Sequence, residues 1–176
     1  MTNEKNVSYQ TRALVMTALL AALSCVATLV IRIPSPTGGY MNLGDTAVLL
    51  GAYLLGGAYG AAAGAIGPAL ADLISGYTAY VPATLVIKAA MALLAAWIYR
   101  AAGKRTWSLV LASVAAELVM ITGYWLYDAL LAGSLVGALA GVPSNAVQSV
   151  LGIAASTVLA IALRGVSTVR AWFPKL

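Results

Sequence analysis

The side chains best suited to chemistry in this chain are five ionisable groups that lie within or beside apolar segments. They are Asp45, Asp72, Lys88, Glu117 and Asp128. An unpaired charge inside a membrane costs several kcal/mol, so each of these groups needs a partner or a ligand. The pattern predicts a polar site near one surface of a membrane protein.

Two helical faces in the middle and later parts of the chain carry part of this polar set. Thr84 and Lys88 are four residues apart and therefore share a face, with Lys88 about 9 Å below the start of its helix. Glu117, Tyr124 and Asp128 form a single stripe of the next helix. The partner of Lys88 is left open among Glu117, Asp128 and Asp72, or its ammonium group snorkels to the surface.

The last apolar segment adds two amides on one face, Asn145 and Gln148. Amides supply hydrogen-bond donors and acceptors without a charge, which suits the edge of a polar heterocycle. Spacing and topology together predict a pocket that opens outward, and a small, uncharged or weakly charged heteroaromatic molecule fits this chemistry. The expected lining residues are Lys88, Tyr124, Asp128, Asn145 and Gln148.

Composition places the chain in the membrane class. Of its 176 residues, 62% are hydrophobic and 9% are charged, and the mean hydropathy is +0.93. At roughly 20 apolar residues per span, this length suits one compact, all-α bundle of about six transmembrane helices and leaves no room for a second domain. We therefore expect residues 1–176 to form a single membrane domain.

Six apolar segments can be drawn, at residues 12–31, 43–57, 58–75, 82–100, 106–131 and 143–164. The second and third share about 33 residues, or roughly 50 Å of helix, which is short for two full spans. At least one of them must be short, tilted or broken. The polar residues 1–11 precede the first segment, which shows no convincing cleavage site and is expected to be retained.

The basic residues predict the orientation. Most of them fall on one side of a six-span arrangement, and by the positive-inside rule that side is cytoplasmic, with both termini. They are Lys5, Arg12, Arg100, Lys104, Arg105, Arg164, Arg170 and Lys175. The outer connections are then residues 32–42, 76–81 and 132–141. The first contains two prolines and two glycines, which predict an ordered turn or lid.

Small residues at helix-packing intervals occur twice. Gly56, Gly60 and Gly64 form two overlapping G-x-x-x-G spacings, for which packing inside the bundle is the expected role. Ala18 and Ala22 form a smooth patch on the first helix, and this patch could serve either internal packing or the docking of a partner.

Several classes of function are disfavoured. The chain contains no histidine and a single cysteine, Cys25, which excludes an internal disulfide, a histidine-dependent triad and the usual zinc ligand sets. The basic residues do not form one face, which disfavours nucleic-acid binding. We expect no enzymatic activity, no cofactor and no metal.

Three blocks of sequence resemble the substrate-binding S components of energy-coupling factor (ECF) vitamin transporters. They are GGYMNLGD, AGAIGPALADLISGYTAYVPATLVIK, and AAELVMITGYWLYDALLAG followed by VPSNAVQ. The resemblance covers nearly the whole chain, and the order and spacing of all three blocks agree. It implies a six-helix bundle in a prokaryotic plasma membrane that binds a vitamin from outside and hydrolyses nothing itself, and the chain indeed lacks a P-loop pattern.

The resemblance also implies partners and residue roles. The S component pairs with a membrane coupling protein that carries two cytoplasmic ATPases, and it topples in the membrane to deliver its ligand. Ala18 and Ala22 would dock on the coupling protein. The blocks look most like the branch linked to hydroxymethylpyrimidine and pyridoxine-type compounds. The candidate substrate-binding residues are Tyr40, Asn42, Asp45, Asp72, Tyr80, Thr84, Lys88, Glu117, Tyr124, Asp128, Asn145 and Gln148.

Two alternatives stay open at this point. The ligand could be another vitamin, such as riboflavin, because riboflavin S components share the general plan. The chain could also be a solitary secondary transporter in which Glu117 or Asp128 carries a proton against Lys88.

Overall fold

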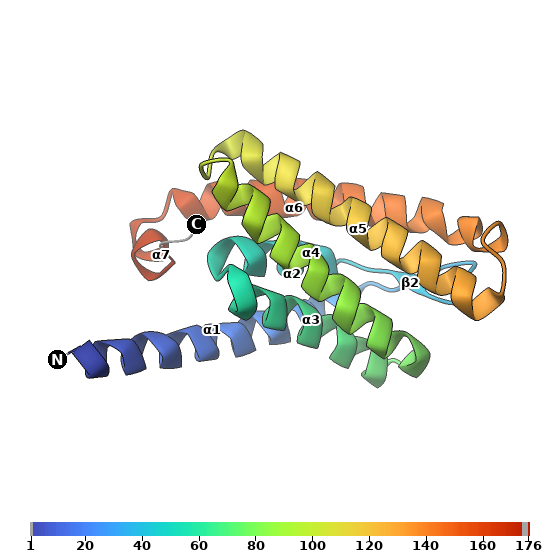
Figure 1. The fold of residues 1–176 in the computed structure, drawn as a ribbon, viewed down its shortest axis with the longest axis horizontal. Coiled ribbons are helices and arrows are strands. Elements are labelled where there is room, and N and C mark those ends of the chain that lie inside the picture. The colour runs from blue at the N-terminus through green and yellow to red at the C-terminus, as the bar shows by residue number, and fades with distance from the viewer. Residues whose placement is uncertain (1, 174–175) are drawn as a thin grey trace.

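A computed structural model describes residues 2–173 and 176, with side chains from residue 10 onward. Within these residues, seven α-helices and one small sheet form a bundle with the two-stranded sheet at one end (Figure 1). The helices are α1 (Thr2–Val30), α2 (Gly44–Leu54), α3 (Gly57–Ile74), α4 (Val81–Ala101), α5 (Thr106–Ala132), α6 (Val142–Arg164) and α7 (Ser167–Trp172). The strands are β1 (Ile33–Pro34) and β2 (Tyr40–Met41), and 3₁₀ turns cover Thr78–Tyr80 and Gly137–Gly141.

Helices α1 to α6 follow the six predicted segments in order, but the predicted count of six helices is not confirmed. The short helix α7 was not expected, and α1 extends back through the polar N-terminal residues to Thr2. The predicted turn after the first helix contains an antiparallel ribbon that pairs Ile33 with Met41 and Pro34 with Tyr40. The fold is therefore all-helical apart from this ribbon.

Four stretches among the described residues are long and apolar enough to cross a membrane: Gln10–Val30, Thr78–Ala101, Thr106–Ala132 and Gly137–Arg164. Helices α2 and α3 are not among them. Helix α2 has 11 residues and is therefore only about 16 Å long. This confirms the prediction that the second and third segments cannot both be full spans.

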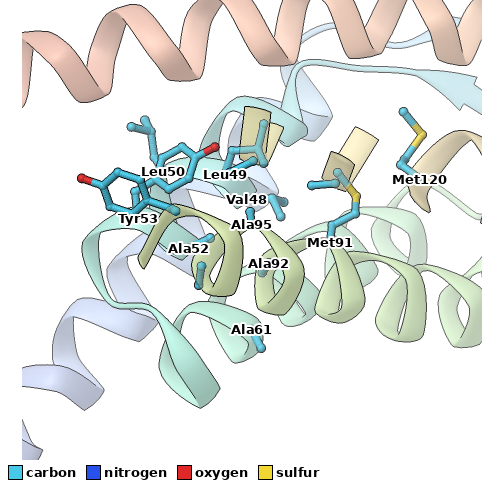
Figure 2. Close-up of a cluster of buried hydrophobic side chains, with 14 of the residues drawn as sticks. Val48, Leu49, Leu50, Ala52, Tyr53, Ala61, Met91, Ala92, Ala95 and Met120 are labelled. Atoms are coloured by element: carbon cyan, nitrogen blue, oxygen red, sulfur yellow. The ribbon is translucent and has the colours of Figure 1, made fainter. Parts of the chain in front are cut away.

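The short helix α2 is the centre of the bundle. It packs against α1, α3, α4 and α6, and all of its residues except Thr46 are buried. Its apolar side chains meet Met91 and Ala92 of α4 in the main core cluster (Figure 2). Because α2 is enclosed on all sides, a polar residue placed on it is removed from both lipid and water.

Glycines of α3 allow its close approach to neighbouring helices, as predicted. A Cβ atom on Gly60 would lie 2.9 Å from the carbonyl oxygen of Gly51, and one on Gly64 would lie 2.9 Å from Val48. Gly67 meets Ala21 and Ser24 of α1 in the same way. Close packing of backbones is how membrane helices associate without a hydrophobic driving force.

The end of the bundle opposite the ribbon holds both termini and the α4–α5 connection (Figure 1). The guanidinium group of Arg164 donates hydrogen bonds to the Tyr99 hydroxyl and to the Lys104 carbonyl oxygen, and that of Arg12 lies 4.8 Å from the Trp172 ring. The basic residues expected to be cytoplasmic therefore gather at one end. Lys175 lies outside the described residues, as does the side chain of Lys5.

Gly60→Ala tests the contact between α3 and α2. The added methyl group meets backbone atoms of α2 that cannot move aside cheaply, so we expect the free energy of unfolding to fall by about 1–3 kcal/mol. Thermal unfolding in detergent measures the effect. Ala58→Val adds bulk on the exposed side of the same helix and should leave the melting temperature nearly unchanged. Equal stability of the two variants would contradict this packing.

Candidate functional site

A cavity lies at the end of the bundle that carries the ribbon, between helices α3, α4, α5 and α6 and the loop of residues 31–43, which we call the hairpin loop. The space accessible to the centre of a water molecule is about 30 Å³, which is room for about two waters. Its lining residues are Ser35, Thr37, Gly39, Tyr40, Asn42, Asp72, Tyr80, Thr84, Tyr124, Asp128, Asn145 and Gln148. Its lining side chains carry carboxylates, amides and hydroxyl groups together with three tyrosine rings.

The hairpin loop closes the cavity through contacts with two helices. The Ser144 hydroxyl of α6 donates a hydrogen bond to Ser35 Oγ at 3.0 Å, and the Tyr80 hydroxyl lies 3.2 Å from the Thr37 carbonyl oxygen. Gly38 has a φ of +95°, a conformation that favours glycine, and it brings Gly39 against the ring of Tyr80. The predicted turn therefore lies over the cavity.

Aromatic rings cluster on and beside the cavity wall. The rings of Tyr40 and Tyr77 are 4.6 Å apart, and Tyr80 lies 6.5 Å from Tyr124 and 5.6 Å from Tyr127. These rings join the hairpin loop, the 3₁₀ turn before α4, and α5. Such a cluster offers flat faces on which a heteroaromatic ring can stack.

Asp72 of α3 anchors one wall by accepting two hydroxyl hydrogen bonds. Tyr40 donates to Oδ1 and Thr84 donates to Oδ2, both at 2.5 Å. Thr84 Oγ1 also lies 2.9 Å from the Tyr124 hydroxyl, and because its own proton is used on Asp72, Tyr124 must be the donor of that bond. Both carboxylate oxygens of Asp72 therefore have partners within the protein.

The Tyr40 phenol stays a hydrogen-bond donor. Burial, and after it the hydrogen bond to Asp72, raises the pKa of Tyr40 well above its ordinary value. The contact between the hairpin loop and α3 therefore persists across the physiological pH range.

Asp128 of α5 forms the other acidic wall. Its Oδ1 accepts a hydrogen bond from the Tyr80 hydroxyl at 2.8 Å, and its side chain is 4% exposed. Gly141 lies beside it, and a Cβ atom there would come within 3.0 Å of Asp128 Oδ2. The missing side chain at Gly141 leaves this oxygen open to the cavity.

Beneath the cavity, a buried ion pair joins α4 to α2. Lys88 Nζ donates to Asp45 Oδ1, and both side chains are at most 2% exposed. The three partners considered from sequence, Glu117, Asp128 and Asp72, were therefore wrong. The sequence pattern did not point to Asp45 because its pairing with Lys88 depends on how deep the short helix α2 sits.

Gln148 connects this ion pair to the cavity and the loop. Its Nε2 donates to Asp45 Oδ2 at 2.6 Å, and its Oε1 accepts from the backbone N–H of Asn42 at 2.7 Å. Asn42 in turn accepts a hydrogen bond from Gly44 N–H, at the start of α2. One amide side chain therefore links α6, α2 and the hairpin loop.

Glu117 belongs to the layer below the cavity. Its Oε2 accepts from the Ser149 hydroxyl at 3.0 Å, while Oε1 has no hydrogen-bond partner among the described residues. A Cβ atom on Gly152 would lie 2.6 Å from Oε1 and 3.1 Å from Asp45 Cβ. Glu117 and Asp45 therefore approach the same point on α6, and glycine at position 152 gives them room.

The lining of the cavity differs from that of the predicted pocket in two places, the layer beneath the cavity and the hairpin loop above it. Lys88, Asp45 and Glu117 are absent from its wall, which corrects the expectation that Lys88 lines the pocket. Sequence reasoning missed Ser35, Thr37 and Gly39, although small polar residues beside the loop prolines were a usable signal. The remaining candidates all lie on the wall: Tyr40, Asn42, Asp72, Tyr80, Thr84, Tyr124, Asp128, Asn145 and Gln148.

The candidate docking residues lie elsewhere, on the outer face of α1. Ala18 and Ala22 are exposed, whereas Ala21 and Ser24 are buried and pack toward Gly67 of α3. Internal packing of α1 therefore uses a different face from the small-residue patch. In the described part of the chain, no group of three or more His, Cys, Asp or Glu side chains is arranged to hold a metal ion.

Lys88→Met tests the ion pair. It leaves Asp45 charged and unpaired in the core, which should lower the free energy of unfolding by about 3–5 kcal/mol. The double variant Lys88→Met with Asp45→Asn removes both charges and should recover most of that loss. Thermal unfolding of the purified variants in detergent measures both effects. Failure of Asp45→Asn to restore stability would contradict the pairing.

Comparisons with known proteins identify the family. The family model described as "ECF-type riboflavin transporter, S component" matches residues 8–165. A protein of Pyrococcus woesei described as an uncharacterized protein in the gap 3' region is 38% identical over 130 residues, which is 73% of this chain and 85% of that protein.

The fold is shared with a solved structure. The structure of the S component of a bacterial ECF transporter superposes with a TM-score of 0.65 at 19% sequence identity, covering 89% of this chain and 97% of that one. ECF S components are membrane-embedded, substrate-binding subunits that pair with ECF modules. The family match over residues 8–165 and the shared fold lead to one conclusion: this chain belongs to the family of ECF-type riboflavin transporter S components.

Proposed function

We propose that this protein is the substrate-binding subunit of an ECF-type importer in a prokaryotic plasma membrane, and that it binds a small heteroaromatic vitamin or vitamin precursor from the outer side. The cavity carries this proposal. It is enclosed by tyrosine rings and by amide and hydroxyl groups, and the hairpin loop covers it. Aromatic walls with a few fixed polar groups are the usual design of a site for a small heterocycle.

The favoured ligand is a compound of the hydroxymethylpyrimidine or pyridoxine type. A one-ring heterocycle needs only a small opening of the hairpin loop, and the Asn145 amide on the cavity wall is available to its edge. Riboflavin is the second candidate, because the matching family is described by that vitamin. Its three-ring system would need a larger opening of the hairpin loop.

Delivery of the ligand would depend on a coupling protein and two cytoplasmic ATPases. With both termini in the cytoplasm, the cavity faces outward and the Ala18 and Ala22 patch faces the membrane on α1. Small residues four apart let another helix come close, and both residues are exposed. We propose that this patch docks on the coupling protein, and that toppling of the whole subunit then exposes the ligand to the cytoplasm.

Vitamin uptake in cells tests this function. We expect Ala18→Trp to bind ligand as the native protein does and to lose ATP-dependent uptake, because the indole obstructs the close approach of another helix. Leu118→Trp, on the exposed side of α5, is the matched control and should retain uptake. Uptake that persists without the coupling protein and follows a proton gradient would instead identify a solitary transporter.

A reversible lock on the hairpin loop tests the cavity. Ser35 Oγ and Ser144 Oγ are 3.0 Å apart, so Ser35→Cys with Ser144→Cys places two thiols within disulfide reach. Because the closed cavity is too small for a heterocycle, oxidation should slow ligand association at least about tenfold, and reduction should restore it. Calorimetry or stopped-flow fluorescence measures binding, with each single variant as a control for pairing with Cys25. Unchanged association after oxidation would show that the loop is not the entrance.

A further inference from the structure

The acidic residues of this chain are concentrated around the cavity. The sequence has five Asp and Glu residues and ten Lys and Arg residues, and four of the five acidic residues lie on the wall or in the layer beneath it. They are Asp45, Asp72, Glu117 and Asp128. A protein with a net charge of +5 therefore has most of its acidic residues around the cavity.

The positively charged side chains nearest the cavity are not available to bind a ligand. Among the side chains that the structure describes, Lys88 is the only buried cation. It is bound by Asp45 and lies 5.4 Å from the centre of the Tyr124 ring. Arg32 is exposed at the start of the hairpin loop and is not on the wall. The wall itself contains two carboxylates, Asp72 and Asp128, and no lysine or arginine. An anionic group on the ligand would find no cation there.

The two wall carboxylates differ in what they can still accept. Both oxygens of Asp72 receive hydroxyl hydrogen bonds. Asp128 receives one, from Tyr80 on Oδ1, and no described residue donates to Oδ2. The side chain is 4% exposed, and Oδ2 lies beside Gly141, which has no side chain to cover it. A hydrogen-bond donor on a ligand in the cavity can therefore reach Asp128 Oδ2.

We propose that the ligand presents a protonated amine or an amino nitrogen to Asp128 Oδ2, and that the site selects amino-substituted heteroaromatic compounds over their carboxylated or phosphorylated forms. This proposal rests on the function proposed above and names the substrate class of the same site. The rings of Tyr80 and Tyr124 flank Asp128 on the wall, and aromatic faces add attraction for a cation. The Asn145 side-chain amide, which lines the cavity, is available to the other edge of the heterocycle.

Charge repulsion supplies the other half of the selectivity. A carboxylate or phosphate on the ligand would lie in a sheltered cavity with two fixed carboxylates, where like charges repel strongly. Release of the ligand's own hydration shell would add to this cost. The site would therefore accept the free vitamin or precursor and reject its phosphorylated form.

Three compounds that share one pyridine ring test the proposal. At the same ring position pyridoxamine carries an aminomethyl group, pyridoxine a hydroxymethyl group and 4-pyridoxic acid a carboxylate. Calorimetry with the purified full-length protein should give the tightest binding for pyridoxamine and the weakest for 4-pyridoxic acid. We expect pyridoxamine to bind at least about tenfold more tightly than pyridoxine, the range of a hydrogen bond to a charged group.

Asp128→Asn identifies the residue responsible. It should reduce the preference for pyridoxamine over pyridoxine to near unity, whereas binding of pyridoxine should change little. Glu4→Gln removes the same charge from the N-terminal end of α1, at the opposite end of the bundle from the ribbon (Figure 1), and should keep the preference. Tyr80→Phe removes the hydroxyl that donates to Asp128 Oδ1 and keeps the carboxylate of Asp128. This variant should retain the preference for the amine, and it keeps the proposal testable if Asp128→Asn does not fold.

The outcomes separate this proposal from the proposed function. Binding of 4-pyridoxic acid as tightly as pyridoxamine, or an unchanged preference in a folded Asp128→Asn protein, would overturn the amine assignment alone. Tight binding of riboflavin with none of the three pyridines bound would do the same and would support the broader function. Binding of no pyridine, pyrimidine or flavin compound would overturn both.

Discussion

The buried ion pair between Lys88 and Asp45 is the interaction on which the candidate site depends. It joins α4 to the short central helix α2, and Gln148 adds α6 through the second oxygen of Asp45. A charge pair this deeply buried stabilises the bundle only when its remaining hydrogen-bonding groups are satisfied. The amide of Gln148 meets that need and, through Asn42 N–H, also fixes the end of the hairpin loop.

This pairing divides the polar groups into two layers with different roles. The lower layer consists of Lys88, Asp45 and Glu117, which do not line the cavity. Within this layer, Lys88 neutralises the charge of Asp45. The upper layer, which includes Asp72, Asp128 and the tyrosines, faces the cavity. Because Lys88 is held below, the cavity wall keeps an acidic character. The same pair that joins α4 to α2 therefore leaves the cavity wall without a lysine or arginine.

The short helix α2 makes this arrangement possible. Because it is enclosed by other helices, it can carry Asp45 into the interior without exposing a charge to lipid. The glycines of α3 bring that helix close to α2 and α1, so that Asp72 reaches the hydroxyls of Tyr40 and Thr84. At the C-terminal end of α2, Phe173 and Leu176 pack against the cluster that contains Leu54 and Leu55.

Much of the site could be predicted from the sequence because helical spacing and topology are local properties. The stripe of Tyr124 and Asp128 and the amide pair of Asn145 and Gln148 were predicted to face one pocket, and the structure places all four on one cavity wall. Likewise, 33 residues were recognised as too few for two full spans. These predictions needed only the period of the helix and the thickness of the membrane.

The pairing of charges could not be predicted, because it depends on depth and rotation of helices that are far apart in the sequence. Asp45 and Lys88 are 43 residues apart, and nothing in their spacing shows that α2 ends midway through the bundle. Ser35 and Thr37 were missed for a similar reason, since only the folded ribbon brings them over the cavity. The sequence by itself determined the class, the helices and most of the polar faces. The tertiary structure decided which carboxylate is paired with Lys88 and which carboxylates lie on the cavity wall, because burial and distance set the energy of a charge in a membrane protein.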